Sequence, residues 1–342
     1  MFFKLKYSII NFMNTKSISG LGEFGLIDFI KKNNSKPLKN HNVSLDIGDD
    51  CFVYEGHKKA KYVVTTDILI ENIHFTRDSA TPEQIGQKSV EVNVSDIASM
   101  GNAKPLYAFV CLGIPKNISQ KFVKKLFESV KNTCDKYAIH LSGGDTVAAK
   151  EITISITLIG ISYKEPIPRT KAKTGDLIFV SGTFGDSGAG LELLQQKNKK
   201  SLKFFEKELI KKHLSPQAKL NLANKMSEKI KITSMTDSSD GLFKSVELLT
   251  QTKGAVINIE NIPVSKSLIK YTGKDYKKLY NFALFGAEEF ELVFTVDKTD
   301  KVKAEKLFPE IKCIGFITGN KKTKYYLKDK IQNIKYDGYK HF

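Results

Sequence analysis

Five short acidic segments, each bordering an apolar stretch, constrain this chain more than any other feature. No lysine or arginine lies within these segments, although the chain carries 54 Lys and Arg residues. Carboxylates beside a buried strand or helix face cost free energy unless they are paired or bound to a cation. The residues are Asp49 and Asp50 (IGDDC), Asp67 (VVTTD), Asp96 (VNVSDIASMG), Asp145 (LSGGDT), and Asp237 and Asp240 (TDSSDG). We expect all but Asp96 to lie in tight turns after strands, and Asp96 to lie on a helix.

A hard divalent cation bound to phosphate would satisfy these carboxylates. Mg²⁺ takes oxygen ligands, keeps several waters and bridges to substrate phosphates. Flanking glycines, such as Gly48 and Gly144, let backbone N–H groups approach phosphate oxygens closely. A single aspartate in such a turn is usually a cap or an Asx-turn residue. Five segments together predict metal-assisted phosphate chemistry.

The apolar patterning predicts a mixed α/β fold in two domains. A chain of 342 residues can bury two cores. Strands are expected at 43–47, 62–66, 106–114, 139–141 and 152–161, with helices at 82–100 and 119–137. Further strands are expected at 177–181, 255–259, 291–296, 311–317 and 325–327, with helices at 185–194, 203–213, 216–229 and after Gly241. The proline-containing stretch 164–175 predicts a junction, which gives an N-terminal extension (1–20) and domains at 21–163 and 164–342.

Several nucleotide-binding classes are excluded because their motifs are absent from the sequence. There is no G-x-x-x-x-G-K-[ST] segment of a P-loop enzyme, and no H-R-D or D-F-G set of a protein kinase. The stretch 20–25 matches G-x-G-x-x-G, but no βαβ pattern surrounds it, so it does not predict a dinucleotide site. The four cysteines lack C-x-x-C spacing and the six histidines are scattered, which argues against zinc and disulfide frameworks.

The formal net charge of +17 permits two interpretations. One is a nucleic-acid-binding protein or a basic surface that attracts an anionic substrate. The other, which we favour, is a lysine-rich solvated surface, because the lysines are dispersed and Arg77 and Arg169 are the only arginines. The apolar runs are far shorter than the ~20 residues of a membrane span, so no membrane association is expected. Cysteine usage and the lack of a secretory signal predict a cytoplasmic protein.

Taken in order, the motifs resemble those of the thiamine-monophosphate kinase family. They are GEFGLI (22–27), IGDDC (47–51), TTDILIENIHF (65–75), VNVSDIASMG (92–101), LSGGDT (141–146), GDLIFVSGTFGDSGAGL (175–191), TDSSDGL (236–242) and GAEEFEL (286–292). The resemblance covers nearly the whole chain after about residue 20. It implies the two-domain fold of the aminoimidazole ribonucleotide synthetase superfamily, with mixed sheets flanked by helices and N-terminal strands that form a barrel at a homodimer interface.

The resemblance also implies transfer of a phosphoryl group from ATP to thiamine monophosphate, with Mg²⁺ as cofactor. The metal-binding positions it implies are Asp50, Thr65, Thr66, Asp67, Asp96, Asp145, Asp237 and Asp240, of which Asp50, Asp145 and Asp240 are the catalytic candidates. The implied ATP contacts are Gly144, Asp145, Arg169 and Ser239, and Tyr137 is a candidate for the adenine pocket, or equally a core aromatic. The implied contacts to thiamine monophosphate are His74, Glu288 and Tyr336.

The sequence departs from the family pattern at one loop, where G-G-E-D-Y-E is replaced by Gly286-Ala-Glu-Glu-Phe-Glu291. Ala287 resists a positive φ and Glu289 is one methylene longer than aspartate, so the loop is expected to bend differently. Two alternatives stay open. The chain could be another ATP-dependent synthetase of the same superfamily, or a basic nucleic-acid-binding protein.

Overall fold

The computed structural model describes residues 22–34, 37, 41–196, 201–251, 253–335 and 338. The chain divides into two compact units, residues 1–36 with 339–342, and residues 37–338. Helix α1 (Gly22–Asn33) belongs to the first unit, and all other elements belong to the second. Within the described ranges, no helix is both long and apolar enough to cross a membrane.

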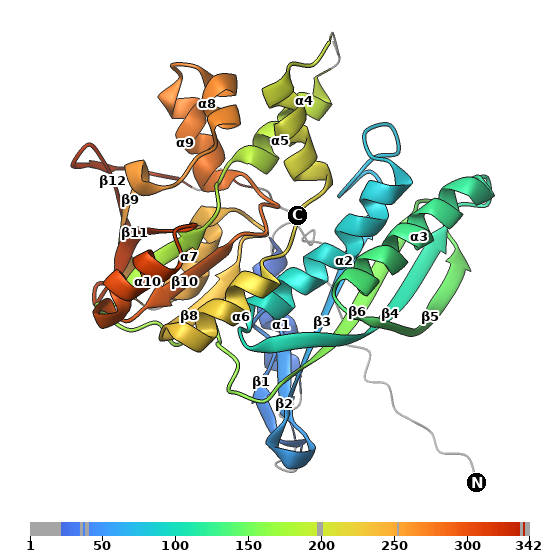
Figure 1. The fold of residues 1–342 in the computed structure, drawn as a ribbon, viewed down its shortest axis with the longest axis horizontal. Helices are drawn as coiled ribbons and strands as arrows, with labels where there is room; N and C mark the ends of the chain where they lie inside the picture. The colour runs from blue at the N-terminus through green and yellow to red at the C-terminus, as the bar shows by residue number, and fades with distance from the viewer. Residues whose placement is uncertain are drawn as a thin grey trace, which may run out of the picture. The chain divides into compact units, whose positions relative to one another are not determined.

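The first half of the large unit forms a six-stranded mixed sheet in the order β1-β2-β3-β6-β4-β5 (Figure 1). The strands are β1 (Val43–Leu45), β2 (Phe52–Glu55), β3 (Lys61–Ile70), β4 (Ala103–Ile114), β5 (His140–Ala148) and β6 (Thr153–Ser162). Neighbouring strands are antiparallel except for β4 and β5, which are parallel. Alternate residues of β6 are buried, so one face of the sheet packs on a core.

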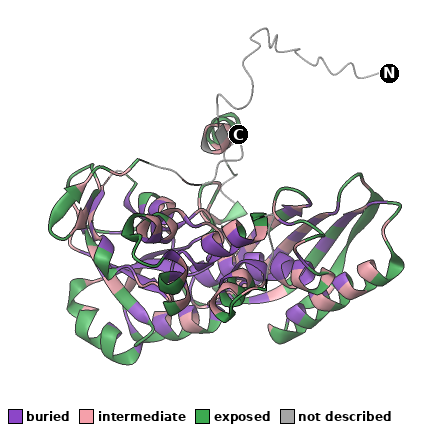
Figure 2. Ribbon diagram, turned by 90° about the horizontal axis from the view of Figure 1, so that it is seen from above, coloured by how far each residue is buried: buried purple, intermediate pink, exposed green. Residues whose placement is uncertain are grey.

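Helices α2 (Pro82–Ser99) and α3 (Gln120–Lys136) cover that buried face. Helix α2 begins with a capping box between Thr81 and Gln84, and Pro82 occupies its first turn. Most of α2 is buried on all sides, because it packs on the first sheet and also on elements of the second half (Figure 2). The opposite face of the sheet exposes large apolar side chains, namely Ile68, Tyr107 and Phe109.

The second half forms a seven-stranded sheet in the order β13-β12-β9-β11-β7-β10-β8. Its strands are β7 (Leu177–Ser181), β8 (Ile232–Asp237), β9 (Gly254–Asn258), β10 (Leu292–Val296), β11 (Ile311–Thr318), β12 (Lys324–Leu327) and β13 (Lys330–Gln332). Its helices are α4 (Asp186–Gln195), α5 (Phe204–Leu214), α6 (Leu220–Lys229), α7 (Leu242–Thr250), α8 (Lys266–Thr272), α9 (Tyr276–Phe285) and α10 (Lys301–Leu307). One apolar core joins the halves, with Ile97 of α2 in the same cluster as Phe179 and Phe294.

The predicted α/β class and most predicted elements are confirmed, and three placements of acidic residues are wrong. Asp237 is the last residue of β8, a strand that the sequence did not predict, and not part of a turn. Asp67 lies inside β3 and not in a turn after it. Asp145 likewise lies inside β5, because this strand continues through Gly143 and Gly144. Gly144 permits the continuation: its φ is +148°, and a Cβ atom there would stand 1.8 Å from the carbonyl oxygen of Val110. The division at residues 163 and 164 stays a prediction.

Candidate active site

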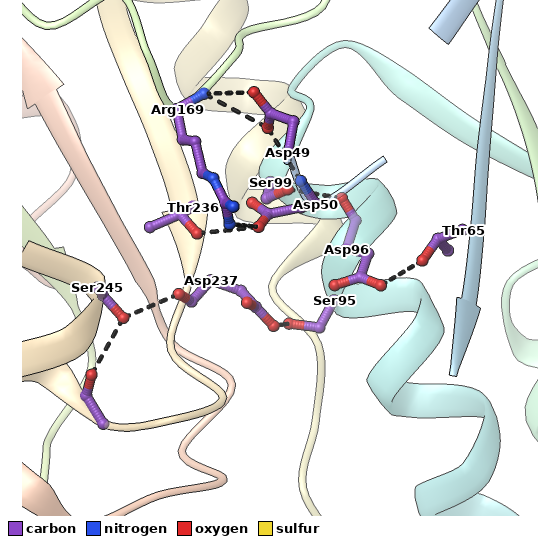
Figure 3. Close-up of polar contacts among 11 residues, drawn as sticks. Asp49, Asp50, Thr65, Ser95, Asp96, Ser99, Arg169, Thr236, Asp237 and Ser245 are labelled. Carbon is purple, nitrogen blue, oxygen red and sulfur yellow. Dashed lines mark hydrogen bonds and ion pairs between the residues drawn. The ribbon is translucent and has the colours of Figure 1, made fainter. Parts of the chain in front are cut away.

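Helix α2 carries the centre of an acidic cluster that draws residues from both halves of the large unit (Figure 3). The Thr65 hydroxyl of β3 donates a hydrogen bond to Asp96, and the Ser95 hydroxyl donates to Asp237 at 2.6 Å. Asp237 is the last residue of β8 and is 5% exposed. Adjacent residues of α2 therefore face acidic or hydroxyl groups of two different sheets.

Asp50 joins the same cluster from the loop between β1 and β2. Its Oδ1 accepts hydrogen bonds from the Arg169 guanidinium and from the Thr236 hydroxyl, both at 3.1 Å. The neighbouring Asp49 accepts a bond from the backbone N–H of Arg169 at 3.2 Å. Asp49 thus fixes the backbone of Arg169, while Asp50 pairs with its side chain.

Electrostatic coupling connects these aspartates with Asp67 and Asp240. Burial, together with the charge of Asp50, raises the pKa of Asp67 to about 6, although a hydrogen bond with Asp96 lowers it. Burial and the charges of Asp67, Asp237 and Asp50 raise the pKa of Asp96 well above its usual range. Burial and the charges of Asp50, Asp67 and Asp240 do the same for Asp237. Five of the six aspartates predicted as metal ligands therefore lie within electrostatic reach of one another, and the sixth, Asp145, is not among them.

The donor set suits a hard divalent cation. Asp50 Oδ2 is buried and has no hydrogen-bond partner among the residues described. Such an orphaned carboxylate oxygen is costly unless a cation binds it. In the same described ranges, no three His, Cys, Asp or Glu side chains form a ready-made metal centre. Carboxylates that need phosphate oxygens and water to complete the shell match the way Mg²⁺ is usually held.

The turn between β8 and α7 connects the cluster to the loop 286–291. Ser239 is exposed in this turn, and its carbonyl oxygen accepts a bond from the backbone N–H of Glu288 at 2.6 Å. The carbonyl oxygen of Ser238 similarly accepts from Phe290 N–H at 3.0 Å. Positive φ values occur at Glu288 and Phe290 rather than at Ala287, so the alanine is accommodated and the bend falls on its neighbours.

His74 and Glu288, the candidate contacts to thiamine monophosphate, both bind the ammonium group of Lys88. Lys88 of α2 forms an ion pair with Glu288 at 2.8 Å and donates to the carbonyl oxygen of His74 at 3.4 Å. Burial raises the pKa of Glu288, but the charge of Lys88 is the largest of the effects that outweigh burial and lower this pKa, and His74 adds a smaller effect in the same direction. Tyr336, the third candidate, lies outside the described residues.

Gly144 and Asp145 lie apart from the acidic cluster within a single chain. In the sheet register, Asp67 of β3 is opposite Ile156 of β6, which is opposite Val110 of β4, which in turn is opposite Gly144 of β5. Asp67 and Gly144 are therefore three strand spacings apart, roughly 14 Å. Asp145 is paired with Cys111, which is exposed, on the face opposite α2 and α3. Thr66 lies on this open face too, where its hydroxyl accepts a bond from Thr157 at 3.1 Å.

A pocket of about 740 Å³ lies between α3 and the end of β5, and Asp145 is not among its lining residues. Its walls include Val123, Phe127, Thr146 and Val147, with Lys124 and Glu128 at its edge. Tyr137 is not among its lining residues: the Tyr137 hydroxyl donates to the buried Glu91 at 2.8 Å. The wall of the pocket is mostly apolar, and charged side chains stand only at its edge.

Two hydroxyl residues of the cluster, Ser95 and Thr236, were not among the sequence candidates. Ser95 stands next to Asp96 within a mostly buried helix, and Thr236 stands directly before Asp237. A polar residue adjacent to an acidic candidate and inside a buried element is the signal that could have identified both.

Comparison with known proteins places this fold in a defined class. Residues 48–162 match the family model described as AIR synthase related protein, N-terminal domain, and residues 173–328 match that of the C-terminal domain. The two sheets are thus the two halves of an AIR synthase related protein.

Comparison with individual relatives identifies the family within this class. The thiamine-monophosphate kinase of Aquifex aeolicus is 39% identical over 280 residues, covering 81% of this chain and 87% of the relative. That of Bacillus subtilis is 30% identical over 333 residues, covering 94% and 100%. A solved structure, AaThiL complexed with AMPPCP and TMP, has 34% identity and a TM-score of 0.82, and it covers 96% of this chain and 99% of its own. The chain belongs to the thiamine-monophosphate kinase family.

Proposed function

We propose that this protein transfers the γ-phosphoryl group of ATP to thiamine monophosphate, which gives thiamine diphosphate and ADP. The observation that carries the proposal is the convergence of five aspartates from four separate segments on one cluster, in a chain of this family. An acidic cluster with an orphaned carboxylate oxygen is the setting in which Mg²⁺ bridges phosphates. We propose Mg²⁺ as the cofactor, held by Asp50, Asp67, Asp96, Asp237 and Asp240 with the Thr65 hydroxyl.

The chemistry needs positioning more than a general base. A phosphate oxygen of thiamine monophosphate, already anionic at neutral pH, attacks the γ-phosphorus, and the bond to the bridging oxygen of ADP breaks. Bound Mg²⁺ supplies charge neutralisation between the two polyanions. Asp49 accepts from the backbone N–H of Arg169 and Asp50 accepts from its guanidinium, and the remaining guanidinium donors are proposed to bind a phosphate. Ser239 is exposed beside Asp240 and is proposed to contact the nucleotide.

The active unit is proposed to be a homodimer formed through the open face of the first sheet. Ile68, Tyr107 and Phe109 are 47%, 47% and 39% exposed on this face. Large apolar side chains exposed on one face of a sheet are typical of a protein interface. Asp145 lies on the same open face, next to Gly144 in the chain, so a second copy docked there would bring its own Asp145 toward the nucleotide phosphates of the first copy. The barrel expected from the resemblance would arise from this pairing.

Placing a charge on the open face is expected to separate the subunits. We expect Phe109→Lys to convert a dimer into a monomer at micromolar concentration, because a lysine buried without a partner at an interface costs several kcal/mol. Light scattering coupled to size-exclusion chromatography measures the mass. Phe204→Lys is the control, since Phe204 is 78% exposed on α5. A wild-type monomer, or a dimer that survives Phe109→Lys and behaves as the control does, contradicts this interface.

The function is tested by incubating the purified protein with ATP, Mg²⁺ and a panel of phosphorylated acceptors, and by separating the products chromatographically. We expect thiamine diphosphate and ADP in equal amounts, and no product from unphosphorylated thiamine. Turnover of ATP only with another acceptor would assign the chain to a sister synthetase. Salt-sensitive binding to duplex or single strands in a gel shift, without kinase activity, would favour the nucleic-acid alternative.

A further inference from the structure

Lys88 is a buried cation whose role the reaction above does not explain. It lies in the first half of α2 with 3% of its surface exposed. Its ammonium group contacts Glu288 Oε1 at 2.8 Å and the carbonyl oxygen of His74 at 3.4 Å. It stands eight residues before Asp96 on the same helix face, about 12 Å along the axis. A lysine so deeply buried is retained at a cost, which points to a specific use of its charge.

Three glutamates of the loop 286–291 are each bound by a different part of the structure. Glu288 is fixed by Lys88, while Glu289 Oε1 accepts the backbone N–H groups of Gly185 and Ser187 at the start of α4, at 2.7 and 2.9 Å. Glu291 accepts from Ser181 at 2.6 Å and pairs with Lys219 at 3.0 Å. Two of these attachments fix the ends of the loop to the second half. The contact with Lys88 is different, because it fixes Glu288 to the helix that carries Asp96.

The second carboxylate oxygen of Glu288 faces a neutral imidazole. His213 Nδ1 lies 3.4 Å from Glu288 Oε2 and 3.1 Å from the Ser187 hydroxyl. Burial and the charge of Lys88 lower the pKa of His213 to about 4, so the ring is uncharged at neutral pH. The cation that forms an ion pair with Glu288 is therefore Lys88. The Glu288 side chain is 21% exposed, which leaves part of it accessible to a ligand.

We propose that Lys88 is a positioning residue for the thiamine end of the acceptor: it holds the Glu288 carboxylate in place for the substrate and does not itself contact the phosphates. Thiamine monophosphate carries a cationic thiazolium ring and an aminopyrimidine, both of which a fixed carboxylate recognises. Without Lys88, the buried Glu288 would take up a proton or turn away, since an unpaired buried carboxylate is unstable. Because the pair joins the acceptor loop to α2, it also sets the distance between acceptor and metal cluster.

The inference rests on the proposed kinase activity, and steady-state kinetics with each substrate varied separately test it. For Lys88→Met we expect the KM for thiamine monophosphate to rise about tenfold or more, with the KM for ATP changed less than about threefold. Glu288→Gln, which is nearly isosteric and keeps an acceptor for Lys88, should give the same pattern. The double variant should be no worse than the poorer single variant, because both changes disable one carboxylate.

Lys61→Met is the matched control, since Lys61 also forms a 2.8 Å ion pair, with Glu55, on a distant part of the first sheet. We expect its KM values to equal those of the wild type. Equal rises in both KM values, a fall in kcat alone, or effects of the two single variants that multiply in the double variant overturn the positioning role. If Lys88→Met does not fold, Glu288→Gln decides the question: an unchanged KM for thiamine monophosphate refutes the inference. Wild-type protein without kinase activity refutes instead the proposed function.

Discussion

Asparagine at position 96 is expected to lower kcat by about a thousandfold and to stabilise the protein when no metal is present. The activity falls because a neutral amide is a poor ligand for Mg²⁺ and offers no charge to neutralise. The metal-free protein gains stability because the change removes one of several carboxylates that repel each other, while Thr65 keeps an acceptor. We expect a rise of about 2–4 °C in Tm with EDTA, corresponding to roughly 1 kcal/mol.

The sign of the pH dependence follows from the raised pKa values. For Asp49 and Asp67 the pKa rises from 3.8 to about 6 on folding, so the folded state holds their protons more tightly than the unfolded state. Their contribution to stability is therefore largest below pH 4 and is lost as the pH rises through 6. Mg²⁺ should consequently raise the wild-type Tm more at pH 8 than at pH 5. In Asp96→Asn this gain should shrink.

Asp135→Asn provides the control for position 96, because Asp135 is exposed on α3. It should leave kcat and the response to Mg²⁺ unchanged. Activity of Asp96→Asn within tenfold of the wild type, or a Tm with EDTA below that of the wild type, would contradict the assignment of a cation site.

Asp145→Asn is expected to abolish activity without lowering Tm, since Asp145 is exposed and bonds only the N–H of Thr146 among the contacts described. Because Asp145 is far from the acidic cluster of its own chain, we also expect it to act on the active site of the partner subunit. When Asp145→Asn and Asp96→Asn subunits are mixed and allowed to exchange, about a quarter of wild-type activity should return. Half of the dimers then contain both kinds of subunit, and each of these has one of its two sites intact.

No recovery after proven subunit exchange would show that Asp145 acts within its own chain, and would remove the reason for placing it at the dimer interface. The exchange itself is verified by mass spectrometry of subunits that carry different tags. Mixing Asp96→Asn with Asp50→Asn is the control, because both residues belong to one cluster and no mixed dimer then has an intact site.

The acidic residues that cluster in the structure could be proposed from the sequence because they border apolar runs and have no basic residue beside them. Asp50, Asp96 and Asp237 stand beside apolar runs, and a carboxylate there needs a cation whatever the fold. The strands β2, β8 and β13 and the helices α1, α8, α9 and α10 were not predicted. Most of these segments are short, and short segments give weak periodicity and depend on tertiary packing.

The continuation of β5 through Gly143 and Gly144 was missed for a different reason. Glycines favour turns locally, but pairing with β4 along the sheet overrides this preference. The placement of Asp145 on the open face depends on strand order and register, which the sequence does not specify. The pair of Lys88 and Glu288 was equally hidden, because 200 residues separate two charges that only the packing of α2 on the second half brings together.

The most direct test of the acidic cluster is a crystal structure with Mn²⁺ and a non-hydrolysable ATP analogue, in which anomalous scattering locates the ions. We predict peaks about 2.2 Å from carboxylate oxygens of Asp50, Asp67, Asp96 and Asp237, each also touching a phosphate oxygen. Ions found only elsewhere, with the nucleotide bound and these four carboxylates still without metal, would contradict the account.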